Sequence, residues 1–157
     1  MITCTRILKS DTGHRVFGHE GKCRHCHGHE YKYEVTAEAQ SLDSIGRVID
    51  FSVIKEKVGS WIDENWDHNF IVYEKDEELK KALNWVAAGK APFISPFNPT
   101  AENMAHYLLT VICPQVLEGT GVIVKRIKVW ETTNCFAEAE LSQAELVKIL
   151  NEDSKKK

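Results

Sequence analysis

The chain has 157 residues and a net charge of −3 at pH 7, with 43% hydrophobic and 27% charged residues. This composition predicts one globular domain over residues 1–157, and its slightly acidic balance argues against nucleic acid or anionic membranes as partners. No apolar run reaches the length of a transmembrane helix. The start of the chain lacks the apolar block of a secretory signal, so we expect a cytoplasmic protein whose five cysteines are reduced.

A strand with strict two-residue alternation is predicted first. The odd positions from 27 to 39 read His, His, Tyr, Tyr, Val, Ala, Ala, whereas the even positions from 30 to 38 are charged or polar. This pattern is typical of a half-buried antiparallel strand that carries His27 and His29 on its inner face. A turn at residues 41–44 then leads to a predicted returning strand at 47–50.

The middle of the chain is predicted to be helical. Apolar residues recur at helical spacing between 51 and 66, and a shorter helix is expected over 76–88, with Gly89 as its cap. The prolines at 92, 96 and 99 exclude regular structure before Thr100. Thr100 caps a further helix, which we expect to stop at Pro114.

The last third of the chain predicts a second hairpin and a final helix. The hairpin strands are expected at 122–131 and 135–141, and Ser142 with Glu145 forms a capping box that opens the helix. The order is then two strands, helices and two strands. This order favours an α+β domain with an antiparallel sheet.

Five of the seven histidines and two of the five cysteines fall between residues 14 and 29. On a strand, His27 and His29 project from one face about 6.5–7 Å apart, a spacing from which two imidazoles converge on one ion. Gly28 between them leaves room for a close approach on the opposite face. We expect the third ligand to be His14, on the preceding strand. Three neutral histidines leave a coordination position open, as in a catalytic zinc site.

Two other interpretations of this cluster stay open. Residues 23–27 match the C-x-x-C-H pattern that attaches a c-type haem, although that attachment normally takes place outside the cytoplasm. Alternatively, Cys23, Cys26, His27 and His29 form a structural zinc knuckle, which would interrupt the strand that starts at His27.

Six short motifs occur in an order that resembles one enzyme family, 6-pyruvoyl-tetrahydropterin synthase / 6-carboxy-tetrahydropterin synthase. They are His14-Arg15, Cys23 four residues before His27-Gly28-His29, Val48-Ile49-Asp50-Phe51, Asp67-His68, Pro99-Thr100-Ala101-Glu102-Asn103 and Trp130-Glu131-Thr132. The resemblance runs from about residue 14 to 141. It implies the tunnelling fold, a four-stranded antiparallel sheet with helices packed on one face, assembled into trimers or hexamers.

The resemblance also implies roles for individual residues. His14, His27 and His29 become the ligands of Zn²⁺, and Cys23 becomes the base that abstracts a proton. A cysteine beside zinc and an imidazolium has a lowered pKa and is thiolate at neutral pH.

Further roles follow for residues later in the chain. Asp67 and His68 become the polarising partners of the base, and Glu131 anchors the pterin through two parallel hydrogen bonds. Thr100 and Glu102 are secondary candidates for substrate contacts. Read without the family, Asp67-His68 is an ordinary pair at a helix end, and Glu131 is a surface strand residue.

The implied activity is a zinc-dependent lyase reaction on 7,8-dihydroneopterin triphosphate. We favour the 6-carboxy-5,6,7,8-tetrahydropterin branch of queuosine biosynthesis, with acetaldehyde and triphosphate as the other products. The alternatives are the 6-pyruvoyl branch, which eliminates triphosphate only, and a non-catalytic zinc-stabilised module that binds pterins or purines. The chain departs from the family at residues 10–13 and in the additional thiol of Cys26. Residues 74–98 are longer than a minimal member needs, which suggests a lid or an interface.

Overall fold

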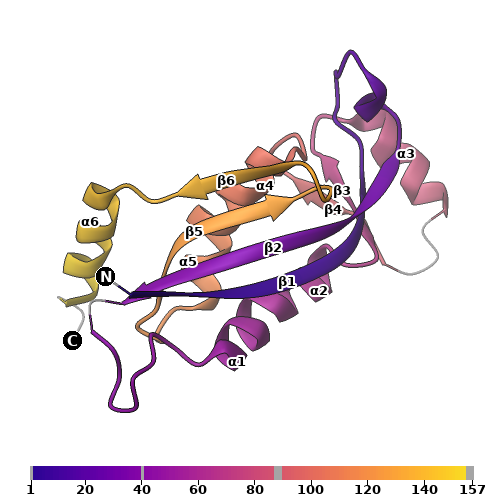
Figure 1. Cartoon of the computed structure of the whole chain (residues 1–157). Helices are drawn as coiled ribbons and strands as arrows, with labels where there is room; N and C mark the ends of the chain where they lie inside the picture. Colours follow the sequence, from indigo (N-terminus) through magenta and orange to yellow (C-terminus); the bar gives the residue numbers. More distant parts are fainter. Residues whose placement is uncertain (1, 40, 87–89, 155–157) are drawn as a thin grey trace.

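A six-stranded sheet with the strand order β4-β3-β1-β2-β5-β6 forms the frame of the structure (Figure 1). The computed structural model describes residues 2–39, 41–86 and 90–154. The strands are β1 (Ile2–His14), β2 (His27–Ala39), β3 (Asn69–Tyr73), β4 (Phe93–Ser95), β5 (Ile123–Trp130) and β6 (Phe136–Glu140). β1, β2, β5 and β6 pair antiparallel, whereas β3 pairs parallel with both β1 and β4.

Two long helical segments pack against one face of this sheet. The first comprises α1 (Phe51–Ile54), the π-helical stretch η2 (Lys55–Gly59) and α2 (Ser60–Asn65). The second comprises α4 (Ala101–Tyr107), the π-helical stretch η3 (Leu108–Ile112) and α5 (Cys113–Val116). The remaining helices are the short η1 (Lys22–Arg24), α3 (Glu77–Val86) and α6 (Gln143–Ser154). None of the helices within the described ranges is long and apolar enough to cross a membrane.

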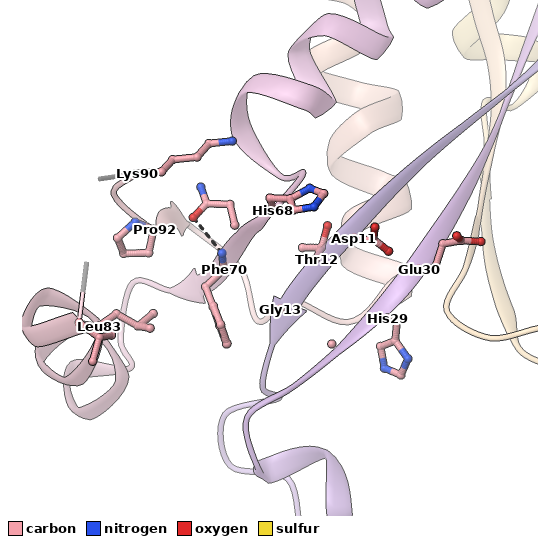
Figure 2. Close-up of a pocket in the computed structure, with 13 residues that line it drawn as sticks. Asp11, Thr12, Gly13, His29, Glu30, His68, Phe70, Leu83, Lys90 and Pro92 are labelled. Carbon is pink, nitrogen blue, oxygen red and sulfur yellow. Dashed lines mark hydrogen bonds between the residues drawn. The ribbon is translucent and has the colours of Figure 1, made fainter. Parts of the chain in front are cut away.

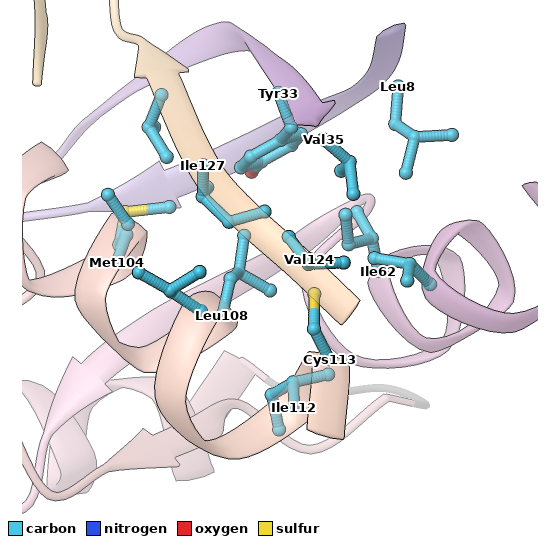
Figure 3. Packing of buried hydrophobic residues seen from close by; sticks show 14 of the residues in the cluster. Leu8, Tyr33, Val35, Ile62, Met104, Leu108, Ile112, Cys113, Val124 and Ile127 are labelled. Atoms are coloured by element: carbon cyan, nitrogen blue, oxygen red, sulfur yellow. The ribbon is translucent and has the colours of Figure 1, made fainter. Parts of the chain in front are cut away.

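The core lies between the inner face of the sheet and the two long helical segments (Figure 3). Tyr33 and Val35 of β2 and Ile127 of β5 are fully buried there, as are Ile62 and Met104 from the helices. Each aliphatic side chain of this kind contributes about 1.5–3 kcal/mol when it leaves water. The alternation predicted for residues 27–39 is confirmed in the middle of β2, where Tyr31, Tyr33, Val35 and Ala37 are buried and Thr36 is the one buried residue of the outer face.

The α+β class is confirmed by the sheet and the helices packed on it, but the prediction of a four-stranded antiparallel sheet is wrong in the number of strands and in the direction of two of them. The four predicted strands include residues 47–50 but give no range for β1, which enters only as the strand that precedes His27. Two further strands, β3 and β4, are absent from the prediction, and they pair parallel at one edge. They are only 5 and 3 residues long. Strands this short do not show enough alternation to be recognised from sequence.

The predicted strand at 47–50 is wrong, because local side-chain hydrogen bonds hold this segment in a turn. Oδ1 of Asp43 accepts from the backbone N–H groups of Ile45 and Arg47, and its Oδ2 accepts from Nε of Arg47. Such bonds offer the backbone an alternative to a strand ladder. Asp50 then caps α1 by accepting from the Ser52 N–H at 2.9 Å.

The predicted helix end at Pro114 is also wrong, since α5 continues to Val116. Pro114 lies in the first turn of α5, directly after the π-helical stretch η3. A first turn tolerates proline because its missing N–H has no required partner there. The helix expected over 76–88 is present as α3, which spans Glu77–Val86. The expected cap at Gly89 lies outside the described residues.

The capping box at the last helix is confirmed. Ser142 Oγ accepts from the Glu145 N–H at 3.3 Å, and Glu145 Oε2 accepts from the Ser142 N–H at 2.8 Å. The two bonds pair donors that the first turn of a helix leaves free.

Candidate functional site

The register of β1 against β2 brings three imidazoles together. His14 pairs directly with His27, and His29 lies two residues further along β2, on the same face. The ring centroids are 4.5 Å apart for His14 and His27 and 4.9 Å apart for His27 and His29. The convergence that strand phase predicted is therefore present in the structure.

Backbone carbonyls fix the orientation of two of these rings. Nδ1 of His14 donates to the Pro99 carbonyl at 2.7 Å, and Nδ1 of His27 donates to the His25 carbonyl at 2.7 Å. Because a carbonyl only accepts, each neutral ring carries its proton on Nδ1 and presents a lone pair on Nε2. The two Nε2 atoms lie 3.2 Å apart. Nε2 of His29 is buried without a hydrogen bond to any described residue.

Glu131, directly after β5, adds a carboxylate to this group. Its Oε1 lies 3.3 Å from Nε2 of His14 and 3.0 Å from Nε2 of His29. The contact with His14 holds the pKa of Glu131 below its usual value, and burial lowers the pKa of His29. At neutral pH this leaves an anionic carboxylate beside a neutral imidazole, which are the protonation states that bind metals.

These four side chains fit a divalent metal ion. Their ligand atoms lie within 4.8 Å of one another, and neutral imidazole with carboxylate is a donor set that zinc favours. The orphaned Nε2 of His29 has a ready partner if an ion occupies this point. Carbonyls on the far nitrogens of His14 and His27 are the supporting hydrogen bonds that metal-binding histidines usually make.

A cavity of about 280 Å³ adjoins the imidazole group through Glu131. Cys23, Thr100 and Glu102 also line this cavity, so four of the predicted site residues share it. Thr100 caps α4 as well, because its Oγ1 accepts from the Asn103 N–H at 3.3 Å.

Cys135 lines the same cavity, and sequence reasoning missed it. Cys135 is exposed. It lies in the loop between β5 and β6, where its carbonyl accepts from the Glu131 N–H at 3.1 Å.

The loop that carries Cys23 is hydrogen-bonded to both ends of the segment 74–98. Arg15 donates from Nε and Nη2 to Asp76 at 2.6 and 2.5 Å, just before α3. Just after β4, the Asn98 side chain accepts from the Phe17 N–H and donates to the Phe17 carbonyl, each at 2.8 Å. The segment 74–98 therefore fixes the position of the loop after β1, and we call these contacts the clamp. The length of the segment in the sequence did not indicate this structural role.

We expect Asp76→Asn to lower the free energy of unfolding by about 3 kcal/mol, because Asp76 is 1% exposed and Arg15 would lose its buried partner. Asp76 also accepts from the Leu79 N–H at 3.1 Å at the start of α3, and asparagine keeps an oxygen for that bond. The Arg15 hydrogen bond lowers the pKa of Asp76, so this stabilisation is present above the carboxyl's unfolded pKa of about 4 and is lost as pH falls through its folded pKa.

Urea unfolding of both proteins at pH 7 and pH 3 tests this prediction, and the difference between them should shrink at pH 3. Glu78→Gln is the matched control. Glu78 is the exposed second partner of Arg15, with 83% of its side chain accessible, so its loss should cost less than about 1 kcal/mol. Equal stability of Asp76→Asn and the parent chain would contradict the clamp.

The structure does not bring Asp67 and His68 to the cavity of Cys23. They lie in the turn between α2 and β3, where Asp67 accepts from the Asp11 N–H at 2.8 Å and from Nδ1 of His68 at 2.7 Å. The Asp67 hydrogen bond raises the pKa of His68, whose side chain is 78% exposed. Among the described residues, no hydrogen bond or ion pair joins either side chain to Cys23.

His68 instead lines a second, larger cavity of about 550 Å³, together with Asp11, Phe70 and Lys90. Figure 2 shows β1 and β2 running between the His29 ring and the side chains of His68 and Phe70. His29 lines this second cavity as well, whereas Cys23 and Glu131 line the first one.

The other histidines and cysteines between residues 14 and 29 lie outside the groups of converging metal-ligand atoms found among the described residues. His19 lines the Cys23 cavity, and its Nδ1 accepts from the Gly21 N–H at 2.7 Å. Neither Cys23 nor Cys26 belongs to a group of converging metal-ligand atoms among the described residues. This arrangement gives no support to the zinc-knuckle interpretation.

Comparison with known proteins points to one enzyme family. The profile of the family described as 6-pyruvoyl tetrahydropterin synthase matches residues 3–142. A Rickettsia bellii protein named 6-carboxy-5,6,7,8-tetrahydropterin synthase is 41% identical over 138 residues, which cover 88% of this chain and 99% of that protein. A Haemophilus influenzae protein of the same name is 30% identical over 142 residues, covering 88% and 98%.

Solved structures share the fold. An uncharacterised protein from Wolinella succinogenes has a TM-score of 0.76 at 22% identity, covering 90% of this chain and 98% of that one. The 6-pyruvoyl tetrahydropterin synthase of Caenorhabditis elegans has a TM-score of 0.64 at 22% identity, covering 90% and 96%.

Proposed function

Since the chain belongs to the 6-pyruvoyl tetrahydropterin synthase family of pterin-processing enzymes, we propose that it is a zinc-dependent 6-carboxy-5,6,7,8-tetrahydropterin synthase. The substrate is 7,8-dihydroneopterin triphosphate, and with water it yields 6-carboxytetrahydropterin, acetaldehyde and triphosphate. The product serves queuosine biosynthesis in the cytoplasm. The relatives' shared name supports this branch over triphosphate elimination to a 6-pyruvoyl product.

One observation carries the proposal. Three lone pairs from His14, His27 and His29 converge beside Glu131, and Glu131 also lines the cavity that contains Cys23. When bound, zinc supplies Lewis-acid polarisation of the substrate's side-chain hydroxyls, which acidifies the adjacent C–H bonds.

The chain's own residues then divide the work. Cys23 takes the proton from the side-chain carbon as the general base. Glu131 holds the pterin edge through two parallel hydrogen bonds. Thr100 and Glu102, at the start of α4, border the same cavity and contact the substrate there.

We also propose that the active site is completed between copies of the chain in a homo-oligomer, a trimer or hexamer. Asp67 and His68 polarise Cys23 in the family-based assignment, yet within one chain neither lines the Cys23 cavity, and His68 lines a different one. Both side chains are accessible to a neighbour, with 30% and 78% of their surface exposed. A second copy that presents Asp67 and His68 to the Cys23 cavity reconciles the two observations.

The function is tested by incubating the purified, zinc-loaded protein with 7,8-dihydroneopterin triphosphate and identifying products by mass spectrometry. We expect 6-carboxytetrahydropterin and one acetaldehyde for each substrate consumed. A 6-pyruvoyl product without acetaldehyde would move the chain to the other enzymatic branch. Binding without turnover would leave only a pterin-binding module.

A further inference from the structure

We propose that the carboxylate of Glu131 is itself the fourth metal ligand in the substrate-free protein, and that it leaves the metal when the pterin binds. The second half of this inference rests on the proposed function, whereas the first half depends only on the geometry of the group. All four coordination positions of the metal would then be filled in the substrate-free protein, and substrate binding would free one of them.

The distances between the ligand atoms support a fourth ligand. Four atoms bound at about 2.0 Å to one tetrahedral zinc ion lie about 3.3 Å from one another. Nε2 of His14 is 3.2 Å from Nε2 of His27 and 3.3 Å from Oε1 of Glu131. Nε2 of His29 is 3.0 Å from the same oxygen. Oε1 of Glu131 therefore lies from the Nε2 atoms of two histidines at the distance expected for ligands of one shared ion.

A simple ion pair between Glu131 and protonated histidines explains the group less well. His14 and His27 use Nδ1 on backbone carbonyls, and their Nε2 atoms lie 3.2 Å from each other. An ion pair between Glu131 and one of the rings leaves this contact between two imidazole nitrogens unexplained. A shared cation brings the three imidazole lone pairs and the carboxylate oxygen to one point, including the buried Nε2 of His29, whose neighbour is the Glu131 carboxylate.

Glu131 cannot hold the metal and the pterin in the same way at the same time. Two parallel hydrogen bonds to a 2-aminopyrimidinone edge use both carboxylate oxygens, but Oε1 lies among the imidazoles. The side chain is 26% exposed and borders the Cys23 cavity. It therefore has room to turn from the imidazole group into that cavity.

The test measures metal binding without turnover. Zinc affinity is determined by competition with a chromophoric chelator, and the Co²⁺-substituted protein is followed by its visible absorption, in the parent chain and in Glu131→Gln. We expect Glu131→Gln to bind zinc at least about tenfold more weakly and to change the Co²⁺ spectrum. Glu102→Gln is the matched control, since this carboxylate lines the same cavity but lies outside the converging group; it should match the parent in both readouts.

The exchange is tested by adding neopterin to the Co²⁺-substituted parent chain. We expect its spectrum to change in the direction of the Glu131→Gln spectrum. If Glu131→Gln keeps the zinc affinity and Co²⁺ spectrum of the parent while its circular dichroism shows a folded protein, the ligand assignment is overturned. If neopterin binds without altering the Co²⁺ spectrum, the exchange is overturned. Because neither readout needs turnover, loss of the proposed enzymatic function would leave the ligand assignment standing.

Discussion

Replacing Cys23 by alanine is expected to lower kcat by about a thousandfold, because the proton on the substrate's side chain loses its base, while the metal content stays unchanged. Cys23 lines the cavity beside Glu131 but does not belong to the converging group of His14, His27 and His29. Product formation by mass spectrometry and zinc by elemental analysis measure the two quantities on the same sample.

The neighbouring thiol provides the control. Cys26 is exposed and does not line the Cys23 cavity, so Cys26→Ala should keep activity within about twofold of the parent. Loss of zinc from Cys23→Ala would instead make Cys23 a ligand and revive the zinc knuckle. A fully active Cys23→Ala would remove the thiol from the mechanism.

Two inactive variants are expected to restore activity when they are produced together in one cell. Cys23→Ala and His68→Ala each lack one part of the site. If a site takes Cys23 from one copy and His68 from its neighbour, mixed oligomers with equal amounts of both contain about a quarter of intact sites. We therefore expect about a quarter of the parent activity, measured per chain in the co-purified protein.

The control for this experiment pairs Cys23→Ala with Cys23→Ser, which cannot complement each other in any arrangement. If Cys23→Ala with His68→Ala stays as inactive as that pair, although tags show that mixed oligomers have formed, the two residues do not act across an interface. Asp67 and His68 would then serve the fold or the second cavity rather than Cys23.

The parts of the site that could be predicted from sequence are those carried by one regular strand. Alternation along β2 identified the face that carries His27 and His29, and the structure places both rings beside His14. These predictions succeed because side-chain direction in a strand depends only on odd or even position.

The remaining parts depend on contacts between distant segments. The Pro99 carbonyl that orients His14 and the Asp76 carboxylate that holds Arg15 are 85 and 61 residues away in sequence. A backbone carbonyl is present at every position and therefore leaves no signal in the sequence. The separation of His68 from Cys23 likewise depends on the parallel pairing of β3 with β1, which was not recognised.

The pairing of His14 with His27 has a consequence for folding. A slip of β1 against β2 by one residue would put Gly13 opposite His27 and turn His14 to the outer face. Only chains that fold in the correct alignment would offer three imidazoles to an ion and gain its binding energy. The metal would thus stabilise correctly aligned molecules selectively, and misaligned molecules, which cannot bind it, would unfold and be degraded more readily.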